Sequence, residues 1–118
     1  MTIKKMYEYV NLRLSIDERT FIAFFNETVA DLVLLYEAKY IYESEDNNTD
    51  EIPKIDSLGD DNPIFEVYHI AILYNILYLC GLGDNFKSEY LQKAESAYLK
   101  KWNEASGKSG VILKREDW

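Results

Sequence analysis

The sequence has few of the residues that usually form disulfides, catalytic pairs or metal sites. Its 118 residues include one cysteine, one histidine and two prolines. Because Cys80 is the only cysteine, no disulfide can form within the chain, which fits a reducing compartment. With one histidine and one cysteine, both on a nearly wholly apolar stretch, no pairing of a nucleophile with a base is indicated. We therefore expect a protein that is not an enzyme and that needs no cofactor.

We expect neither a signal peptide nor a membrane-spanning segment in this sequence. The first residues, Met1 to Glu8, carry charge without the apolar run of a signal peptide. The most apolar stretch, between Pro63 and Cys80, is interrupted by Glu66, His69 and Asn75, and it falls short of the ~20 apolar residues that a membrane span needs. We therefore expect no membrane partner.

Basic residues are in deficit, and the excess acid is concentrated in one segment. The chain has 13 Lys and Arg against 21 Asp and Glu, a net charge of −8. This charge argues against nonspecific attraction to nucleic acid or anionic lipid. Between residues 43 and 61, eight acids stand against the single Lys54, which gives −7; the acids are Glu43, Glu45, Asp46, Asp50, Glu51, Asp56, Asp60 and Asp61. The rest of the chain is therefore close to neutral.

Apolar residues, 47% of the chain, recur at helical spacing and predict an all-α fold with one core. We expect about four helices, at residues 2–14, 17–42, 63–80 and 85–105, in a single domain of residues 1–106. Thr2 could cap the first helix, and Ser15 with Glu18 matches a capping box for the second. Asn62 and Pro63 have the pattern of an N-cap and first helical residue. Gly81 or Gly83 could end the third helix, and Asp84 could cap the fourth.

Three motifs with possible chemistry do not meet the requirements of their sites. Glu66 and His69 have the spacing of a di-iron bundle pair, but that site needs two such pairs, so a hydrogen-bonded core histidine is expected. Asp46, Asn48 and Asp50 resemble the start of a calcium loop, but Glu51 replaces its glycine and Ser57 its final glutamate. Residues 107–109 read Gly-Lys-Ser but follow a helix, whereas a phosphate-binding loop precedes one. We therefore predict no metal site.

The order of the segments resembles a known protein family. A short helix leads to a long one containing the run from Phe24 to Tyr40, and an acidic loop ends in Ser57-Leu58. An apolar helix containing Tyr68 to Leu77 follows, then Gly-Asp-Asn and a last helix with Tyr90 to Tyr98 and Trp102. Over residues 1–106 this pattern is similar to the small all-helical head–tail connector proteins of tailed bacteriophages, also called adaptor or head-completion proteins.

The resemblance implies a structural virion protein made in the bacterial cytoplasm. Such proteins form a closed ring, usually of about twelve copies, between the portal protein and a tail or stopper protein. DNA passes through the ring without specific binding. The acidic loop is longer than this resemblance leads us to expect, so it could face the channel, the next subunit, the tail or only solvent.

The C-terminal residues 107–118 are predicted to form an extended tail that docks on a partner. In the family that the chain resembles, this tail often reaches into the portal. The residues for this contact are Val111, Ile112, Leu113, Lys114 and Trp118. Strand addition to a partner's sheet is one way an extended apolar segment binds. The tail could also be disordered or pack on its own bundle.

Two other classes of function remain open from the sequence. An inhibitor that mimics DNA, such as an anti-defence protein that binds a host protein, would carry acids in rows over its folded surface. In this chain the acids cluster in one loop, which weakens that interpretation. A helical antitoxin or regulatory adaptor is a further alternative.

Overall fold

The computed structural model describes residues 1–43 and 52–106, which form four α-helices and two short 3-10 turns. The helices are α1 (Ile3–Asn11), α2 (Glu18–Leu35), α3 (His69–Leu79) and α4 (Asp84–Ser106), and the turns are η1 (Ala38–Tyr40) and η2 (Glu66–Tyr68). Within these residues the only β pairing is an isolated bridge between Tyr42 and Ile64. The predicted all-α bundle is therefore confirmed. The predicted tail of residues 107–118 lies outside the described residues.

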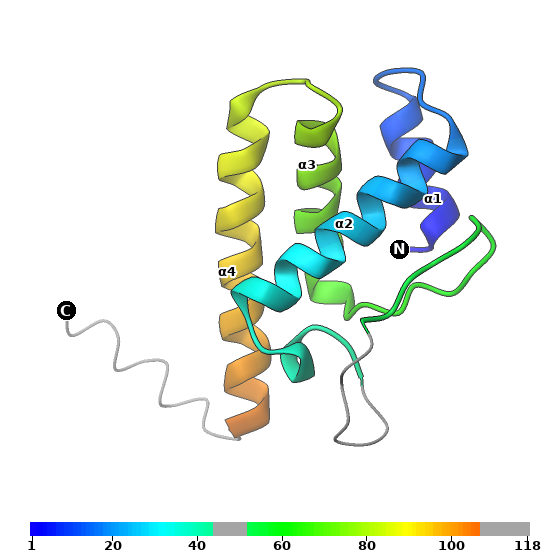
Figure 1. Ribbon diagram of the computed structural model, residues 1–118. Helices are drawn as coiled ribbons and strands as arrows, with labels where there is room; N and C mark the ends of the chain where they lie inside the picture. The colour runs from blue at the N-terminus through cyan, green and yellow to red at the C-terminus, as the bar shows by residue number, and fades with distance from the viewer. Residues whose placement is uncertain (44–51, 107–118) are drawn as a thin grey trace.

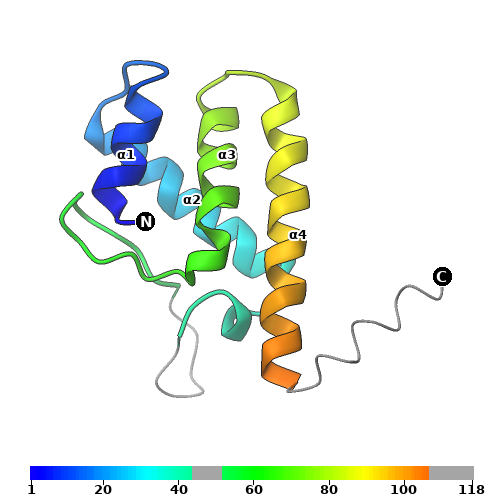
Figure 2. The same cartoon turned by 180° about the vertical axis from the view of Figure 1, so that it is seen from behind.

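Helix α3 lies at the centre of the bundle. Seven of its eleven residues are buried, including His69 and Asn75. Figures 1 and 2 show α4 running antiparallel beside α3, with α2 crossing one face and α1 lying to the side. A helix that is apolar nearly all round must be covered on several sides, and these three helices supply the cover. No helix in the described part of the chain is both long enough and apolar enough to cross a membrane.

Helix α1 confirms the spacing read from the sequence. The Thr2 hydroxyl caps it by accepting a hydrogen bond from the Lys5 amide at 3.1 Å. Ile3, Met6 and Val10 are fully buried, as expected for one face of a helix. The helix ends at Asn11, three residues before the predicted end.

The predicted capping box of α2 is wrong. Its N-cap is Asp17, whose carboxylate accepts a hydrogen bond from the Thr20 amide at 2.7 Å, and this bond lowers the pKa of Asp17. The start of the helix is displaced because α1 holds the preceding residue from both sides. The Ile16 carbonyl accepts a bond from the Tyr7 hydroxyl at 2.9 Å, and the Ile16 amide donates to Asn11 at 3.0 Å.

Helix α2 also ends seven residues earlier than predicted, at Leu35. Tyr36 is extended, and η1 then turns the chain so that Ile41 and Tyr42 enter the core. The Ile41 carbonyl accepts a bond from the Phe65 amide at 3.0 Å. A continued helix would carry these apolar residues past the end of the bundle, so their burial favours the turn.

The predicted start of α3 at Pro63 is likewise wrong. The Asn62 side chain does accept a bond from a following amide, Ile64, at 3.1 Å, but it forms a local turn rather than a helix cap. Residues 63–65 stay extended because Ile64 pairs with Tyr42. Helical structure begins only at Glu66.

The end of α3 is a glycine-terminated turn, as the sequence indicated. The Leu82 amide donates to the Leu77 carbonyl at 3.2 Å, and the Gly81 amide donates to Tyr78 at 2.9 Å. Gly81 has a φ of +87°, which side chains other than glycine rarely tolerate. Asp84, predicted as a cap, is instead the first residue of α4.

Polar bonds join α2 to the rest of the core. The Asn75 amide donates to the Thr28 hydroxyl, which donates to the Phe24 carbonyl, both at 2.8 Å. Asn26 bonds both the amide and the carbonyl of Ile55, each at 3.0 Å, and so fixes the loop before α3. These polar side chains at the packed face of α2 therefore have hydrogen-bond partners within the protein.

Two fully buried tyrosines differ in the partners of their hydroxyls. The Tyr90 hydroxyl donates to the Asp31 carboxylate at 2.5 Å, which connects α4 to α2. The buried Tyr68 hydroxyl has no hydrogen-bond partner among the described residues. Burial is the main reason that the pKa of both phenols is raised.

We predict opposite effects of removing these two hydroxyls. Tyr90→Phe should lower the free energy of unfolding by about 1.5–3 kcal/mol, the range for a hydrogen bond to a charged group. Tyr68→Phe should leave it unchanged or raise it by up to about 1 kcal/mol, because a buried hydroxyl without a partner is not compensated for lost hydration. Urea unfolding of both variants measures this. Equal losses of stability would show that the two hydroxyls do not differ in this way.

Candidate functional site

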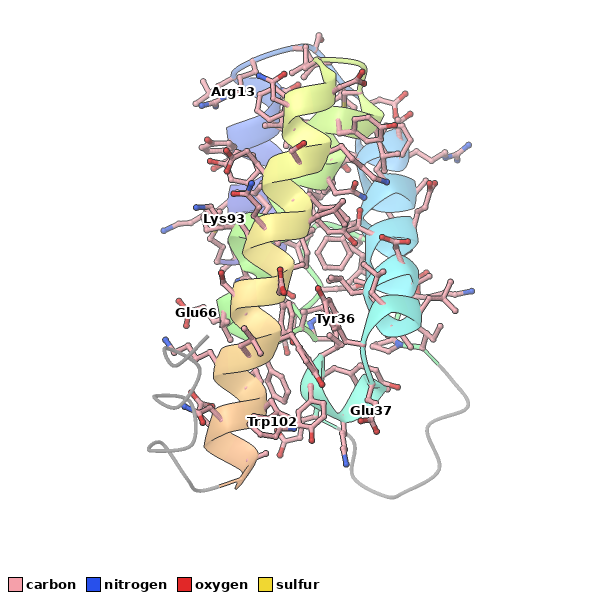
Figure 3. The ribbon with its side chains drawn as sticks, turned by 90° about the vertical axis from the view of Figure 1, so that its left-hand side faces the viewer. Arg13, Tyr36, Glu37, Glu66, Lys93 and Trp102 are labelled. Atoms are coloured by element: carbon pink, nitrogen blue, oxygen red, sulfur yellow. The ribbon has the colours of Figure 1, made fainter. Side chains whose placement is uncertain are left out.

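An open groove lies at the C-terminal end of α4. It has a volume of about 490 Å³ and is bordered by η1, by the extended residue before η2 and by the last turns of α4. Its lining residues are Lys39, Tyr40, Phe65, Lys101, Trp102, Glu104 and Ala105. Figure 3 shows Trp102 near the lower end of α4, on the side that faces η1. We call this feature the aromatic groove.

The backbone turns described above bring the groove residues together. The Phe65 amide bonds to Ile41, which places Phe65 beside the end of η1. Tyr40 packs edge-on against Tyr98 of α4, with ring centroids 5.5 Å apart, and this contact holds η1 against the helix. Tyr98 in turn stacks on Tyr36 at 4.5 Å. The groove therefore has a fixed aromatic floor.

Charged residues line the edge of this floor. The Lys101 ammonium lies 3.8 Å from the centre of the Phe65 ring and 3.3 Å from the Glu104 carboxylate. Lys39 lies 5.2 Å from the Tyr40 ring and 3.9 Å from Glu37, which is outside the groove. Exposed ion pairs of this kind contribute little energy, but ammonium groups over rings favour contact with aromatic surface. An apolar segment with some charged residues is the kind of ligand that fits here.

A second, smaller concavity lies where α2, α3 and α4 meet. Its volume is about 270 Å³, and its lining includes Leu34, which is 85% exposed. The other lining residues are Glu27, Ala30, Asp31, Asn75, Tyr78, Leu79 and Lys87. Leu34 therefore exposes apolar surface beside the acidic side chains of this concavity.

His69 is the hydrogen-bonded core histidine that the sequence predicted. Its Nε2 donates to the Ile64 carbonyl at 2.8 Å, so its Nδ1 accepts from the Met1 ammonium, also at 2.8 Å. Burial, above all, lowers the pKa of His69, and the nearby ammonium adds to this effect. Both ring nitrogens are occupied, which leaves neither available as a metal ligand or general base.

The surroundings of Cys80 and of the acidic side chains can be compared with those of reactive thiols and metal ligands. Cys80 is half-buried, and burial raises the pKa of its thiol, which disfavours the reactive thiolate. Over residues 1–43 and 52–106, no three His, Cys, Asp or Glu side chains are placed to hold a metal ion.

The predicted acidic segment is described only in part. Glu43, Asp56, Asp60 and Asp61 lie in the described residues, whereas Glu45, Asp46, Asp50 and Glu51, with the calcium-like spacing, lie outside them. Asp60 has a local structural role, because its carboxylate accepts bonds from the Asp56 and Ser57 amides at 2.7 and 3.1 Å. These bonds lower the pKa of Asp60.

The aromatic groove was not found from the sequence. Its lining comes from three segments separated by 24 residues or more, and their meeting depends on the early end of α2. Phe65 and Trp102 also fall at ordinary apolar positions of the predicted helices, so neither residue marks a groove in the sequence. Comparison of the chain with protein-family models, with curated proteins and with solved structures finds no match in any of the three.

We predict that His69 makes the fold less stable at mildly acidic pH. Its folded pKa lies below the unfolded value of about 6.5, so its contribution is complete above that pH and is lost as the pH falls toward the folded pKa. His69→Gln should remove this loss, which urea unfolding at about pH 7.5 and 5.5 would measure. Asp17 and Asp60, whose pKa is lowered, lose their contributions only at more acidic pH. The same pH dependence in both proteins would exclude His69 as its source.

Proposed function

We propose that the protein is a ring-forming structural component of a tailed bacteriophage, which lies between the portal and the tail. DNA passes through the channel of this ring. The order and apolar pattern of the helices over residues 1–106 resemble the head–tail connector family, and the all-α fold agrees with that resemblance.

The observation that carries the proposal is a pair of exposed leucines, one at the end of α1 and one in the last turn of α2. Leu12, in the turn before α2, is 83% exposed, and Leu34, in its last turn, is 85% exposed. The helix between them spans roughly 25 Å at ~1.5 Å per residue. Figure 1 shows the turn and the end of α2 on opposite sides of the bundle.

Two different apolar sites on opposite sides of one chain favour head-to-tail association. In such a contact, one surface of each copy meets the other surface of the next, and a closed ring results if the rotation between copies closes. Leu34 lies beside Glu27, Asp31 and Lys87, whereas Leu12 is followed by the exposed Arg13. Two acids stand against one base around Leu34, so Arg13 of the next copy meets an excess of acid there.

The distribution of charge on α4 argues against the alternative of a DNA mimic. This helix carries four acids, Asp84, Glu89, Glu95 and Glu104, and four lysines, Lys87, Lys93, Lys100 and Lys101. A DNA mimic needs rows of acids with few bases, because it presents the charge of a phosphate backbone. The mixed surface of α4 instead fits contact with other proteins.

The direct test is co-expression with the portal of the same phage, followed by imaging for rings. Leu34→Asp should abolish rings, because it places a charge beside Glu27 and Asp31 in an apolar contact. The matched control is Ser88→Asp, which adds the same charge at an exposed position of α4. Both variants should unfold within about 0.5 kcal/mol of the parent, because both positions are exposed. Native mass spectrometry that finds only monomer, with and without portal, would contradict the proposal.

Neutralising the acidic segment tests its place in the ring. Seven acids are replaced by amides and Asp60 is kept, since it holds the turn at Ser57. If the segment faces the channel, DNA should be held more tightly at low salt and ejected more slowly, and high salt should remove the difference. Measurement of DNA retention and ejection from assembled particles decides this. Unchanged behaviour at low salt would leave the segment a role in solubility alone.

A further inference from the structure

The aromatic groove leaves apolar surface uncovered within the described part of the chain. The rings of Tyr40, Phe65 and Trp102 are only partly buried and line a space of about 490 Å³. Ala105, at its edge, is in the last turn of α4, directly before the point where residues 107–118 continue. The groove therefore lies next to a stretch of chain that could cover it.

Two segments outside the described residues are continuous in sequence with the residues around the groove, and only one of them has suitable chemistry. Residues 44–51 read Ser-Glu-Asp-Asn-Asn-Thr-Asp-Glu and contain no apolar side chain. Residues 107–118 contain the run Val111, Ile112 and Leu113. Burial of aliphatic side chains on an aromatic floor is favourable, whereas burial of carboxylates is not.

The tail is long enough to make this contact. Val111 follows Ser106 by five residues, which can span up to about 17 Å when extended. Trp102 lies four residues before Ser106, or roughly 6 Å along the helix axis. Gly107 and Gly110 lie between Ser106 and the apolar run, and glycine adopts the conformations of a reversing turn at low cost.

We propose that Val111, Ile112 and Leu113 bind in the aromatic groove of their own chain. A short connection gives an effective concentration in the millimolar range, so the tail of the same molecule outcompetes that of a second copy. The contact goes beyond the proposed ring function, since it forms in the isolated protein. It gives the tail a resting position from which a partner such as the portal must displace it.

The two tryptophans permit a direct test, because Trp102 lines the groove and Trp118 lies in the tail. In Trp118→Phe the emission reports Trp102 alone, and the same holds for a chain that ends at Ser106. Removal of the tail should raise the quenching of Trp102 fluorescence by acrylamide about twofold or more. The reason is that the bound tail shields the indole ring from acrylamide in the majority of molecules. Equal quenching in both proteins would overturn the proposal.

Substitutions in the tail distinguish its apolar run from its mere presence. One variant, in the Trp118→Phe background, replaces the whole apolar run by asparagine (Val111→Asn, Ile112→Asn and Leu113→Asn). Its Trp102 fluorescence should be quenched by acrylamide as strongly as that of the truncated chain. The matched control, Lys114→Gln with Arg115→Gln, leaves the apolar run intact and should quench like the parent. If the control loses protection and the asparagine variant keeps it, the charged residues hold the tail and the proposal is wrong.

A substitution in the groove gives an independent measurement. Ala105→Arg places a long side chain at the groove edge and should raise quenching of Trp102, whereas Ser96→Arg, at an exposed position elsewhere on α4, should not. Urea unfolding checks that each variant is folded. No effect of Ala105→Arg would count against the groove as the binding site.

Dilution distinguishes binding of the tail of the same chain from binding of the tail of a second copy. Binding within one chain should give the same quenching from about 1 to 100 µM, far below the effective concentration of a tethered tail. Protection that is lost on dilution would assign the groove to a second copy and overturn the proposal. No portal is present in these measurements, so their outcome is separate from that of the ring experiment.

Discussion

The burial of α3 is the constraint on which the rest of the structure depends. This helix has apolar side chains on nearly every side, and water is excluded only if neighbours cover all of them. Helix α4 packs along it most extensively, while α2 and α1 cover further faces. The two buried polar side chains of α3 itself are paired. Asn75 bonds Thr28, and His69 bonds both Ile64 and Met1. The outer surfaces of the bundle are then left uncovered, and both proposals place their contacts there.

The sequence was sufficient to predict the number, order and approximate place of the helices. Each helix has its own apolar periodicity, and periodicity is a local property. The ends of the helices were less predictable, because Ser15 and Asp17 are both good caps and only contacts from α1 to Ile16 decide between them. The end of α2 has no local signal at all. No proline or glycine follows Leu35 before Pro53, and the turn depends on burial of Ile41 and on its bond to Phe65.

The difference between local sequence patterns and tertiary contacts also explains why the aromatic groove could not be predicted. A groove needs side chains from separate segments, and here η1, Phe65 and α4 meet only because α2 ends early. The hydrogen-bonded state of His69 was predictable, since a lone histidine on an apolar helix must find partners when it is buried. Its particular partner, the start of the chain, was not. The amino-acid composition therefore indicates which side chains need hydrogen-bond partners, whereas the tertiary contacts determine which residues become those partners.

The contact between Met1 and His69 joins residues 68 positions apart, and this separation affects how the protein folds during synthesis. The first helix leaves the ribosome early, but the surface of α3 on which Ile3, Met6 and Val10 pack is made much later. At ~5–20 residues per second, α1 waits several seconds with its apolar face uncovered. Isolated helices of its length are only marginally stable in water. The N-terminal segment therefore completes its fold after the later helices have formed, so its sequence must avoid aggregation during that interval.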